Sequence, residues 1–231
     1  SAGACMRLAL EPEPWCMLGT VADSVALFGE HLFTAAAAAR LAGLTGRSRP
    51  ASMAALRRHL GVCFDACHMA VEFEDPADAL ARLRAAEIDV VKFQVSAGMV
   101  ATLGRDDAPT RTALAAFADD VYLHQVVERR DGALRRFVDL PEALATAAGD
   151  VARREWRIHF HVPIFRETLG ALRSTQPYVA ALLQLLRAQA YGGHLEVETY
   201  TWDVLPEAYR REPVERAVAR ELTWVMEHLA T

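Results

Sequence analysis

Gly61-Val62-Cys63-Phe64-Asp65-Ala66-Cys67-His68 is the stretch of sequence that decides the fold. Its apolar run, Val62 to Phe64, has the length of a buried strand, and a carboxylate and then an imidazole follow it. Strands that are apolar on both faces are typical of parallel sheets covered by helices. In such sheets the chemistry takes place just beyond the carboxyl ends of the strands, which is where we expect Asp65 and His68.

Four other segments have the same form, an apolar strand that ends in polar side chains. These strands are expected at 6–10, 90–95, 156–163 and 194–200. Helical patterns at 21–40, 51–59, 76–86, 110–118, 141–148, 176–190 and 213–229 separate or follow them. The alternation predicts a single α/β domain over residues 1–231 with a parallel sheet. Five strands are fewer than the eight of a closed barrel, so we expect either an incomplete barrel or an open sheet.

An inserted β-hairpin is expected at 121–139, outside the main sheet. Asp131-Gly132 favours a type I′ turn, because that turn needs positive φ at both positions. The arginines beside the turn predict a solvated hairpin, with a phosphate grip as the alternative; they are Arg129, Arg130, Arg135 and Arg136. His124 and Gln125 would reach the site if the hairpin folds over it as a lid.

Composition and charge exclude several classes of protein. The net charge is −5, from 25 basic and 30 acidic residues, and without a long basic run we expect no nucleic-acid partner. The sequence contains no apolar run of about 18 residues, so no membrane span is expected. Four cysteines are too few for a disulfide framework. Cys63 and Cys67 are interpreted as buried thiols, which favours a reducing, cytoplasmic location.

Polar side chains recur at the end of every predicted strand. They are Glu11 and Glu13, Asp65 and His68, Lys92 and Gln94, His159 and His161, and Glu196 and Glu198. Taken alone, His159 could be a hydrogen-bonded core imidazole, and Glu196 could pair with Lys92. Together, however, the converging carboxylates would repel one another unless a cation neutralised them. The pattern predicts a divalent metal, one of Mn²⁺, Mg²⁺, Co²⁺, Fe²⁺ or Zn²⁺, with a metal-free polar cluster as the alternative.

These residues carry a resemblance to a known family. The Asp65 to His68 segment resembles the Asp-x-x-His of strand five in the xylose isomerase-like TIM barrels, the superfamily of the sugar phosphate isomerases and epimerases and of endonuclease IV. Glu11, His159-Phe160-His161 and Glu198 resemble its strands four, seven and eight. Several segments are also similar to the EboE family of metabolite traffic proteins. The resemblance covers most of the chain and implies a partial (β/α)₈ barrel of strands four to eight. Its open edge at Met6–Leu10 would be prone to association.

The resemblance also implies roles for individual residues. It implies metal ligation by Glu11, Asp65, Gln94, His159, His161 and Glu198. Gln94 stands where the epimerases have a histidine ligand, so His161 could replace it, or a separate site could form from His68, His159 and His161. Glu11 and Glu198 would exchange a carbon-bound proton, and His68 would bind a substrate oxygen. The remaining substrate contacts would come from Glu13, Lys92, Glu196 and Trp202.

Three functions follow from these expectations. The first is a metal-dependent isomerase or epimerase that acts on a sugar-like polyol, with or without phosphate, through an enediolate. The second is non-catalytic binding or traffic of a metabolite, as in the EboE family. The third is cleavage of DNA phosphodiesters as in endonuclease IV, which the acidic balance and Gln94 disfavour.

Overall fold

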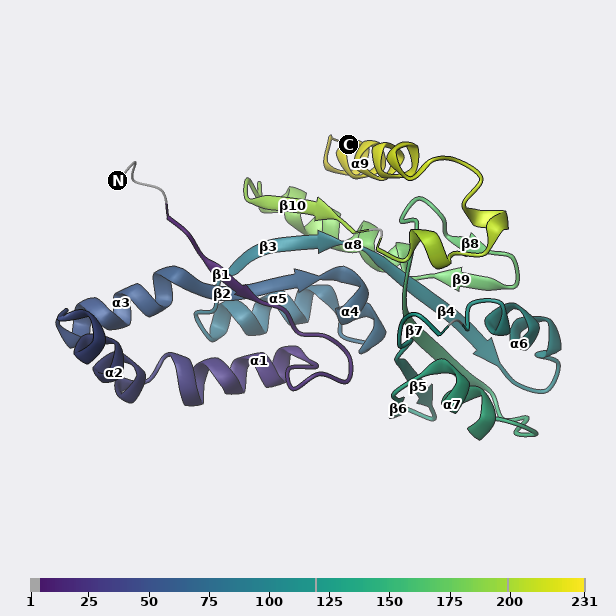
Figure 1. The fold of residues 1–231 in the computed structure, drawn as a ribbon, viewed down its shortest axis with the longest axis horizontal. Helices are drawn as coiled ribbons and strands as arrows, with labels where there is room; N and C mark the ends of the chain where they lie inside the picture. Colours follow the sequence, from purple (N-terminus) through teal and green to yellow (C-terminus); the bar gives the residue numbers. More distant parts are fainter. Residues whose placement is uncertain (1–4, 119, 199, 231) are drawn as a thin grey trace.

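The chain forms two sheets, one parallel and one antiparallel. The computed structural model describes residues 5–118, 120–198 and 200–230 (Figure 1). The parallel sheet has the order β1 (Leu8–Leu10), β2 (Leu60–Asp65), β3 (Val90–Val95), β10 (His194–Val197). The antiparallel sheet has the order β6 (Ala133–Phe137), β5 (Val126–Arg130), β7 (Arg154–Val162), β4 (Ala97–Leu103), β9 (Leu172–Ser174), β8 (Thr168–Leu169). Only Ser96 separates β3 from β4, so the chain passes directly from one sheet into the other.

The parallel sheet aligns the polar strand ends that the sequence predicts. Asp65 of β2 pairs with Gln94 of β3, and Gln94 pairs with Glu196 of β10. Close packing of β2 on the neighbouring loop requires glycine at position 61, because a Cβ there would collide with the carbonyl oxygen of Asp89. The register therefore places carboxylates from separate strands at one edge of the sheet.

Twelve helical segments are assigned within the described residues. They are α1 (Val21–Leu27), the π-helical η1 (Phe28–Leu32), α2 (Ala35–Thr45), α3 (Arg49–His59), α4 (Ala66–Val71), α5 (Pro76–Ala85), α6 (Ala108–Ala115), α7 (Leu140–Thr146), α8 (Gln176–Ala188), the 3₁₀ turns η2 (Trp202–Val204) and η3 (Glu207–Tyr209), and α9 (Val214–Ala230). Thr20 and Asp23 form a capping box on α1. The single helix predicted over 21–40 is divided instead, because the Thr34 hydroxyl caps a new helix by accepting from the N–H of Ala37.

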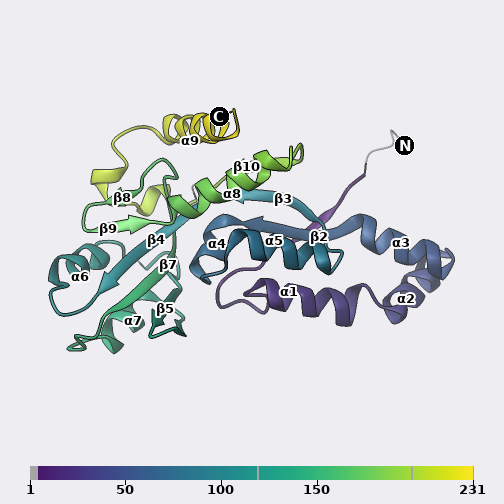
Figure 2. The ribbon, with the colours of Figure 1, turned by 180° about the vertical axis from the view of Figure 1, so that it is seen from behind.

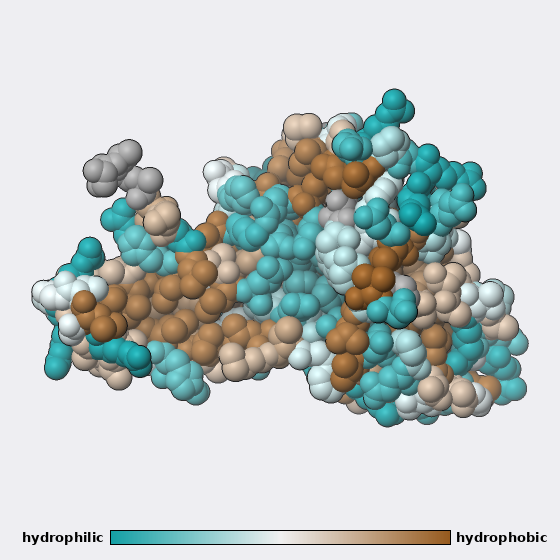
Figure 3. Space-filling view, in the orientation of Figure 1, coloured by the Kyte–Doolittle hydropathy of each residue, from teal (hydrophilic) through white to brown (hydrophobic). Residues whose placement is uncertain are grey.

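Helices cover the parallel sheet on one face. Helices α4, α5 and α8 lie behind β2 and β3 in Figure 1 and in front of them in Figure 2. Leu83 of α5 and Leu182 of α8 are buried, as their predicted spacing requires. The opposite face carries polar side chains, and the hollow at the centre of Figure 3 is lined by hydrophilic residues. This open polar face holds the strand ends described below.

The antiparallel sheet corrects the predicted topology. The sequence predicts the 156–163 strand as part of a parallel sheet, but β7 pairs antiparallel with β4 and β5. The four-stranded parallel sheet is present, whereas an antiparallel sheet of six strands does not fit a TIM barrel. The error has a physical cause, since side-chain patterns along a strand report burial and not strand direction. The strand that pairs with β7, β4, directly follows β3 and was not predicted.

The predicted hairpin turn is confirmed. Asp131 and Gly132 have φ angles of 51° and 81°, as a type I′ turn requires. The hairpin lies outside the parallel sheet, and β5 pairs with both β6 and β7. It is therefore an integral edge of the antiparallel sheet.

The parallel sheet has an open edge at β1. Met6 and Leu8 are 84% and 58% exposed, and among the strands of the described residues β1 pairs only with β2. Cys63 and Cys67 are free buried thiols, as predicted, whereas Cys5 and Cys16 are exposed. Within the described parts of the chain, no helix combines the length and apolarity that crossing a bilayer would need.

Candidate metal centre

Three carboxylates meet at the carboxyl edge of the parallel sheet. Glu11 follows β1, Asp65 ends β2 and Glu198 follows β10. One oxygen from each lies within 4.8 Å of the other two. Burial, and next the charge of Asp65, raises the pKa of Glu198 to about 7. Burial also raises the pKa of Glu11. Carboxylates that disfavour one another's charge in this way form a site that a cation would stabilise.

Asp65 is the most completely buried member of the group. It caps α4 by accepting the N–H of His68 at 2.8 Å, and the Ser96 hydroxyl lies 2.8 Å from both of its oxygens. Burial alone would raise the pKa of Asp65, but the imidazoles of His68 and His161 and these hydrogen bonds hold it below its usual value. Asp65 is therefore a fixed anion at the base of the site.

The antiparallel sheet contributes two histidines, His159 and His161, from the end of β7. Period two places both rings on the same face of the strand. His161 is buried, and among the described residues neither of its ring nitrogens makes a hydrogen bond. Its Nδ1 lies 3.5 Å from Oε2 of Glu198. Burial lowers the pKa of His161 to about 4, so its ring is neutral at physiological pH and can act as a ligand.

His68 and His159 face each other with unprotonated nitrogens. Nδ1 of His68 lies 2.9 Å from the carbonyl oxygen of Pro12, and Nδ1 of His159 lies 2.8 Å from Oε1 of Gln125. Both oxygens can only accept, so each neutral ring carries its proton on Nδ1. The two Nε2 lone pairs then point at each other across 3.0 Å. A proton shared by the two nitrogens, or a metal ion bound beside both of them, would relieve this repulsion.

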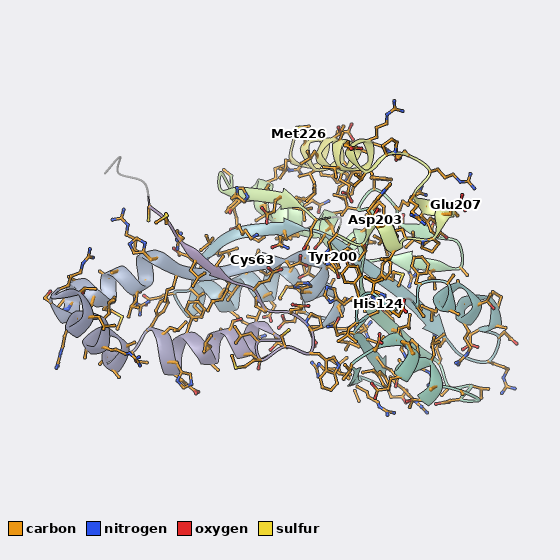
Figure 4. All side chains as sticks on the ribbon, in the orientation of Figure 1. Cys63, His124, Tyr200, Asp203, Glu207 and Met226 are labelled. Atoms are coloured by element: carbon orange, nitrogen blue, oxygen red, sulfur yellow. The ribbon has the colours of Figure 1, made fainter. Side chains whose placement is uncertain are left out.

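A pocket of about 470 Å³ opens above these groups. Its lining residues come from the strand ends and from the segment before β5; they are Glu11, Glu13, His68, Val121, Tyr122, Leu123, Gln125, His159, Glu198 and Tyr200. Tyr200 lies between the labelled Cys63 and His124 in Figure 4, at the junction of the two sheets. Its hydroxyl is 3.4 Å from Nε2 of His159.

Most of the predicted site residues lie together, but six of them do not line the pocket: Asp65, Gln94, His161, Lys92, Glu196 and Trp202. Lys92 forms an ion pair with Glu196 on the same sheet face. Trp202 is buried beside a narrow crevice shared with His161 and Glu198. Glu13 does line the pocket, and its Oε1 is 3.8 Å from Nδ1 of His159.

Gln94 is placed among the carboxylates, but it presents its amide nitrogen to them. Nε2 donates to Glu198 at 2.5 Å and lies 3.4 Å from Oδ2 of Asp65. The Gln94 oxygen accepts instead from the Cys63 thiol at 3.0 Å. In this orientation Gln94 aligns the carboxylates and is not itself a ligand.

Three residues of the site were missed or only half predicted. Ser96 and Tyr200 carried no signal, because a lone hydroxyl after a strand is common. Gln125 was expected only if the hairpin acted as a lid, and it does reach the site, through its bond to His159. Its neighbour His124 instead packs on Phe160, with ring centroids 4.7 Å apart.

The described residues offer three ligand sets whose atoms converge within 4.8 Å. They are Glu11, Asp65 and Glu198; Asp65, His68 and His161; and Cys67, His159 and His161. The unpartnered His161 and the facing Nε2 atoms of His68 and His159 are the arrangement expected of ligands around a cation. These residues could therefore hold a divalent metal ion. Mixed carboxylate and imidazole donors suit Zn²⁺, Mn²⁺, Fe²⁺ or Co²⁺.

Comparison of the chain with protein-family models, with curated proteins and with solved structures found no match.

Proposed function

We propose that this chain is a divalent-metal-dependent isomerase or epimerase that acts on a small polyol of the sugar type. The observation that supports the proposal most is the convergence of Glu11, Asp65 and Glu198 beside His68 and His161 at the base of an open pocket. A bound divalent cation would supply Lewis acidity to neighbouring carbonyl and hydroxyl oxygens. The resemblance to the xylose isomerase-like superfamily stays a hypothesis within this proposal.

Glu198 is the proposed proton-transfer group. In the metal-free protein its pKa is raised to about 7 by burial and by the charge of Asp65. A bound cation would lower this pKa and leave the carboxylate ionised, which is the form that a general base needs. Glu198 also lines the pocket, so its carboxylate can reach a bound substrate. Glu11, whose pKa is likewise raised by burial, would take the reverse transfer. Nδ1 of His68 lies 2.9 Å from the carbonyl oxygen of Pro12, and this contact fixes the orientation of the ring.

The charge of the pocket supports a neutral polyol over a phosphodiester. Among the described residues that line it, there is no lysine or arginine, whereas Glu11, Glu13 and Glu198 are all present. Without a cation these carboxylates would repel a DNA backbone. The endonuclease alternative is therefore disfavoured.

The test is deuterium exchange from D₂O into a panel of uncharged aldoses and ketoses, with protein loaded with Mn²⁺ or Zn²⁺. We expect one carbon-bound proton to exchange in at least one sugar, and Glu198→Gln to abolish that exchange. Glu207→Gln is the control, because Glu207 is an exposed carboxylate remote from the pocket lining. Retention of every carbon-bound proton with the metal-loaded wild type would contradict the proposal.

Binding without turnover is the second candidate. The observation that favours it is the Lys92–Glu196 ion pair, which neutralises the charge of Lys92, one of the expected substrate contacts. In this case Glu198→Gln would leave sugar affinity unchanged, as measured by saturation-transfer NMR, and no exchange would occur in the wild type.

A further inference from the structure

A second polar region lies on the antiparallel sheet, on the same face as the histidines but at the other end of β7. Alternation along β7 puts Glu155 and Arg157 on the face that also carries His159 and His161. The pairing register adds Arg129 of β5 and Arg173 of β9 to that face, because Arg129 lies opposite Glu155 and both Arg157 and Arg173 lie opposite Val100. Arginines from three strands therefore meet on one surface.

Two adjoining cavities, of about 370 and 420 Å³, form a groove over this surface. Glu155 and Arg173 line both, so the two are continuous. The remaining lining residues are Thr102, Arg129, Asp131, Gly132, Arg153 and Arg154 in the first cavity, and Val100, Arg157, Ser174, Thr175, Pro177 and Tyr178 in the second. We call this the arginine groove.

The arginine groove has an excess of positive charge in an acidic chain. Five arginines line it, against the carboxylates of Glu155 and Asp131. Both Glu155 oxygens are already engaged, one by Arg129 and the other by Arg157, each at 3.0 Å. Asp131 is 92% exposed and lies nearest Arg130, which is outside the groove. The two carboxylates of the groove therefore do not neutralise Arg153 or Arg173.

Arg153 and Arg173 are the uncommitted cations. Across the described ranges, 5–118, 120–198 and 200–230, neither has a carboxylate within ion-pair distance. Both side chains are exposed. By contrast Arg154, which lines the same cavity, is buried and bonded to Asp150. The two free guanidiniums can thus bind an incoming anion.

The floor of the groove is rigid. The guanidinium carbons of Arg129 and Arg157 lie 4.4 and 4.0 Å from the centroid of the Phe73 ring. Arg157 also donates to the carbonyl oxygen of Ala70 at 2.6 Å. In addition, the buried hydroxyl of Tyr178 has no hydrogen-bond partner among the described residues and lies at the second cavity. A preorganised cationic surface is suited to a ligand with several acceptor oxygens.

We propose that the arginine groove is a binding site for a small phosphate-bearing ligand, held by Arg153 and Arg173 over the Arg129–Glu155–Arg157 floor. Arginine suits phosphate because its planar fork can donate two parallel hydrogen bonds. The arginine groove shares no lining residue with the pocket above the metal centre. The site is therefore separate from the metal centre and does not depend on the proposed function.

The test uses inorganic pyrophosphate as the probe, with protein freed of metal by chelation and dialysis so that a bound cation cannot contribute. Isothermal titration at low ionic strength and pH 7 should detect saturable binding. Arg173→Gln and Arg153→Gln should each weaken it at least about tenfold, the loss expected for one charge-assisted contact. Both side chains are exposed, and thermal melts establish that each variant is folded.

Arg47→Gln is the matched control, because Arg47 is also exposed and lies between α2 and α3. Figure 1 shows these two helices at the opposite end of the molecule from β5, β7 and β9. It should leave the affinity within twofold of wild type. The proposal is overturned if pyrophosphate does not saturate, if all three variants weaken binding equally, or if neither Arg153→Gln nor Arg173→Gln has an effect. Asp65→Asn should leave pyrophosphate binding unchanged, and a parallel loss would place the anion at the metal centre instead.

Discussion

Nε2 of His68 lies 3.0 Å from Nε2 of His159, and the oxygens that the two Nδ1 atoms face leave both Nε2 atoms without protons when the rings are neutral. Two facing lone pairs are unfavourable without a cation between them. Burial, reinforced by the charges of His68 and His161, lowers the pKa of His159 well below its usual value, so a proton on Nε2 of His159 is unfavourable. The pair is better suited to a metal ion.

The first prediction concerns these tautomers. In metal-free protein at pH 7.5, long-range ¹H–¹⁵N spectra should show His68 and His159 protonated on Nδ1. Addition of Zn²⁺ should move the Nε2 resonances of both and leave their Nδ1 protons in place. The exposed His31 should not respond. A proton on Nε2 of His159 would show instead that Gln125 presents its amide nitrogen, and that the pair needs no cation.

The second prediction concerns Gly98, where β4 passes closest to α4. A Cβ at this position would lie 2.9 Å from Sγ of Cys67 and 2.9 Å from the carbonyl oxygen of Ile158. Gly98→Ala should therefore lower the free energy of unfolding by about 1–3 kcal/mol, as overpacking does. Gly43→Ala in α2 should raise it by about 0.5–1 kcal/mol, since nothing lies within 4 Å of a Cβ there. Urea denaturation measures both, and equal effects of the two substitutions would contradict the packing argument.

The sequence predicts where the strands end but not how all of them pair. Asp65 ends an apolar run that is typical of a buried strand, and Glu198 follows a strand in which apolar Leu195 and Val197 alternate with polar residues. The parallel pairing of both strands with β3 brings the two carboxylates together. The 156–163 run has the same composition, yet β7 is antiparallel, because its direction depends on β4. In the sequence only Ser96 separates β4 from β3, so the boundary between these two strands is hard to recognise.

The site was predictable where a charge stands on an apolar strand, and not where a partner is a neutral donor. Burying Asp65 or His161 is costly without partners, so their presence on such strands is informative. Ser96 and Tyr200 could be exposed at little cost, so their sequence positions indicate nothing. The sequence allows Glu196 either a role in the site or an ion pair with Lys92. The ion pair is present, and it holds Lys92 outside the pocket lining.

The third prediction concerns the contact between the hairpin and α4. The Glu72 side chain is buried, and Nε and one terminal nitrogen of Arg136 donate to it at 2.5–3.1 Å. Arg136→Gln would leave the carboxylate poorly satisfied and should destabilise the fold by about 1–3 kcal/mol. That is less than a fully buried pair would lose, because Arg136 is partly exposed. Arg135→Gln changes an exposed neighbour that pairs with no carboxylate among the described residues, and it should cost less. Chemical denaturation at pH 7 measures the free energy of unfolding of both variants. Equal losses would show that the Arg136–Glu72 ion pair does not contribute to stability.

The last prediction is the pH dependence that Glu198 imposes. Its pKa in the folded protein is about 7 and the ordinary value is 4.5, so between these limits the folded state holds a proton that the unfolded state has lost. The metal-free protein should therefore lose stability as the pH rises from 4.5 to 7. A metal ion must displace the same proton. Affinity for Mn²⁺ or Zn²⁺ should consequently rise about tenfold per pH unit below 7 and level off above it.

The pKa of His161 is about 4, so its ring is neutral between pH 5.5 and 7 and does not contribute to the pH dependence of metal affinity there. Glu198→Gln should abolish the slope and weaken binding at pH 8, whereas Glu207→Gln should preserve both. Competition against a chromophoric chelator between pH 5.5 and 8 gives the affinities. If Glu198→Gln bound metal with the wild-type slope, the titrating ligand would be another group. Since Glu11 is the other carboxylate whose pKa is raised at this edge, Glu11→Gln would then be the variant to lose the slope, and the proton-transfer role would pass to Glu11.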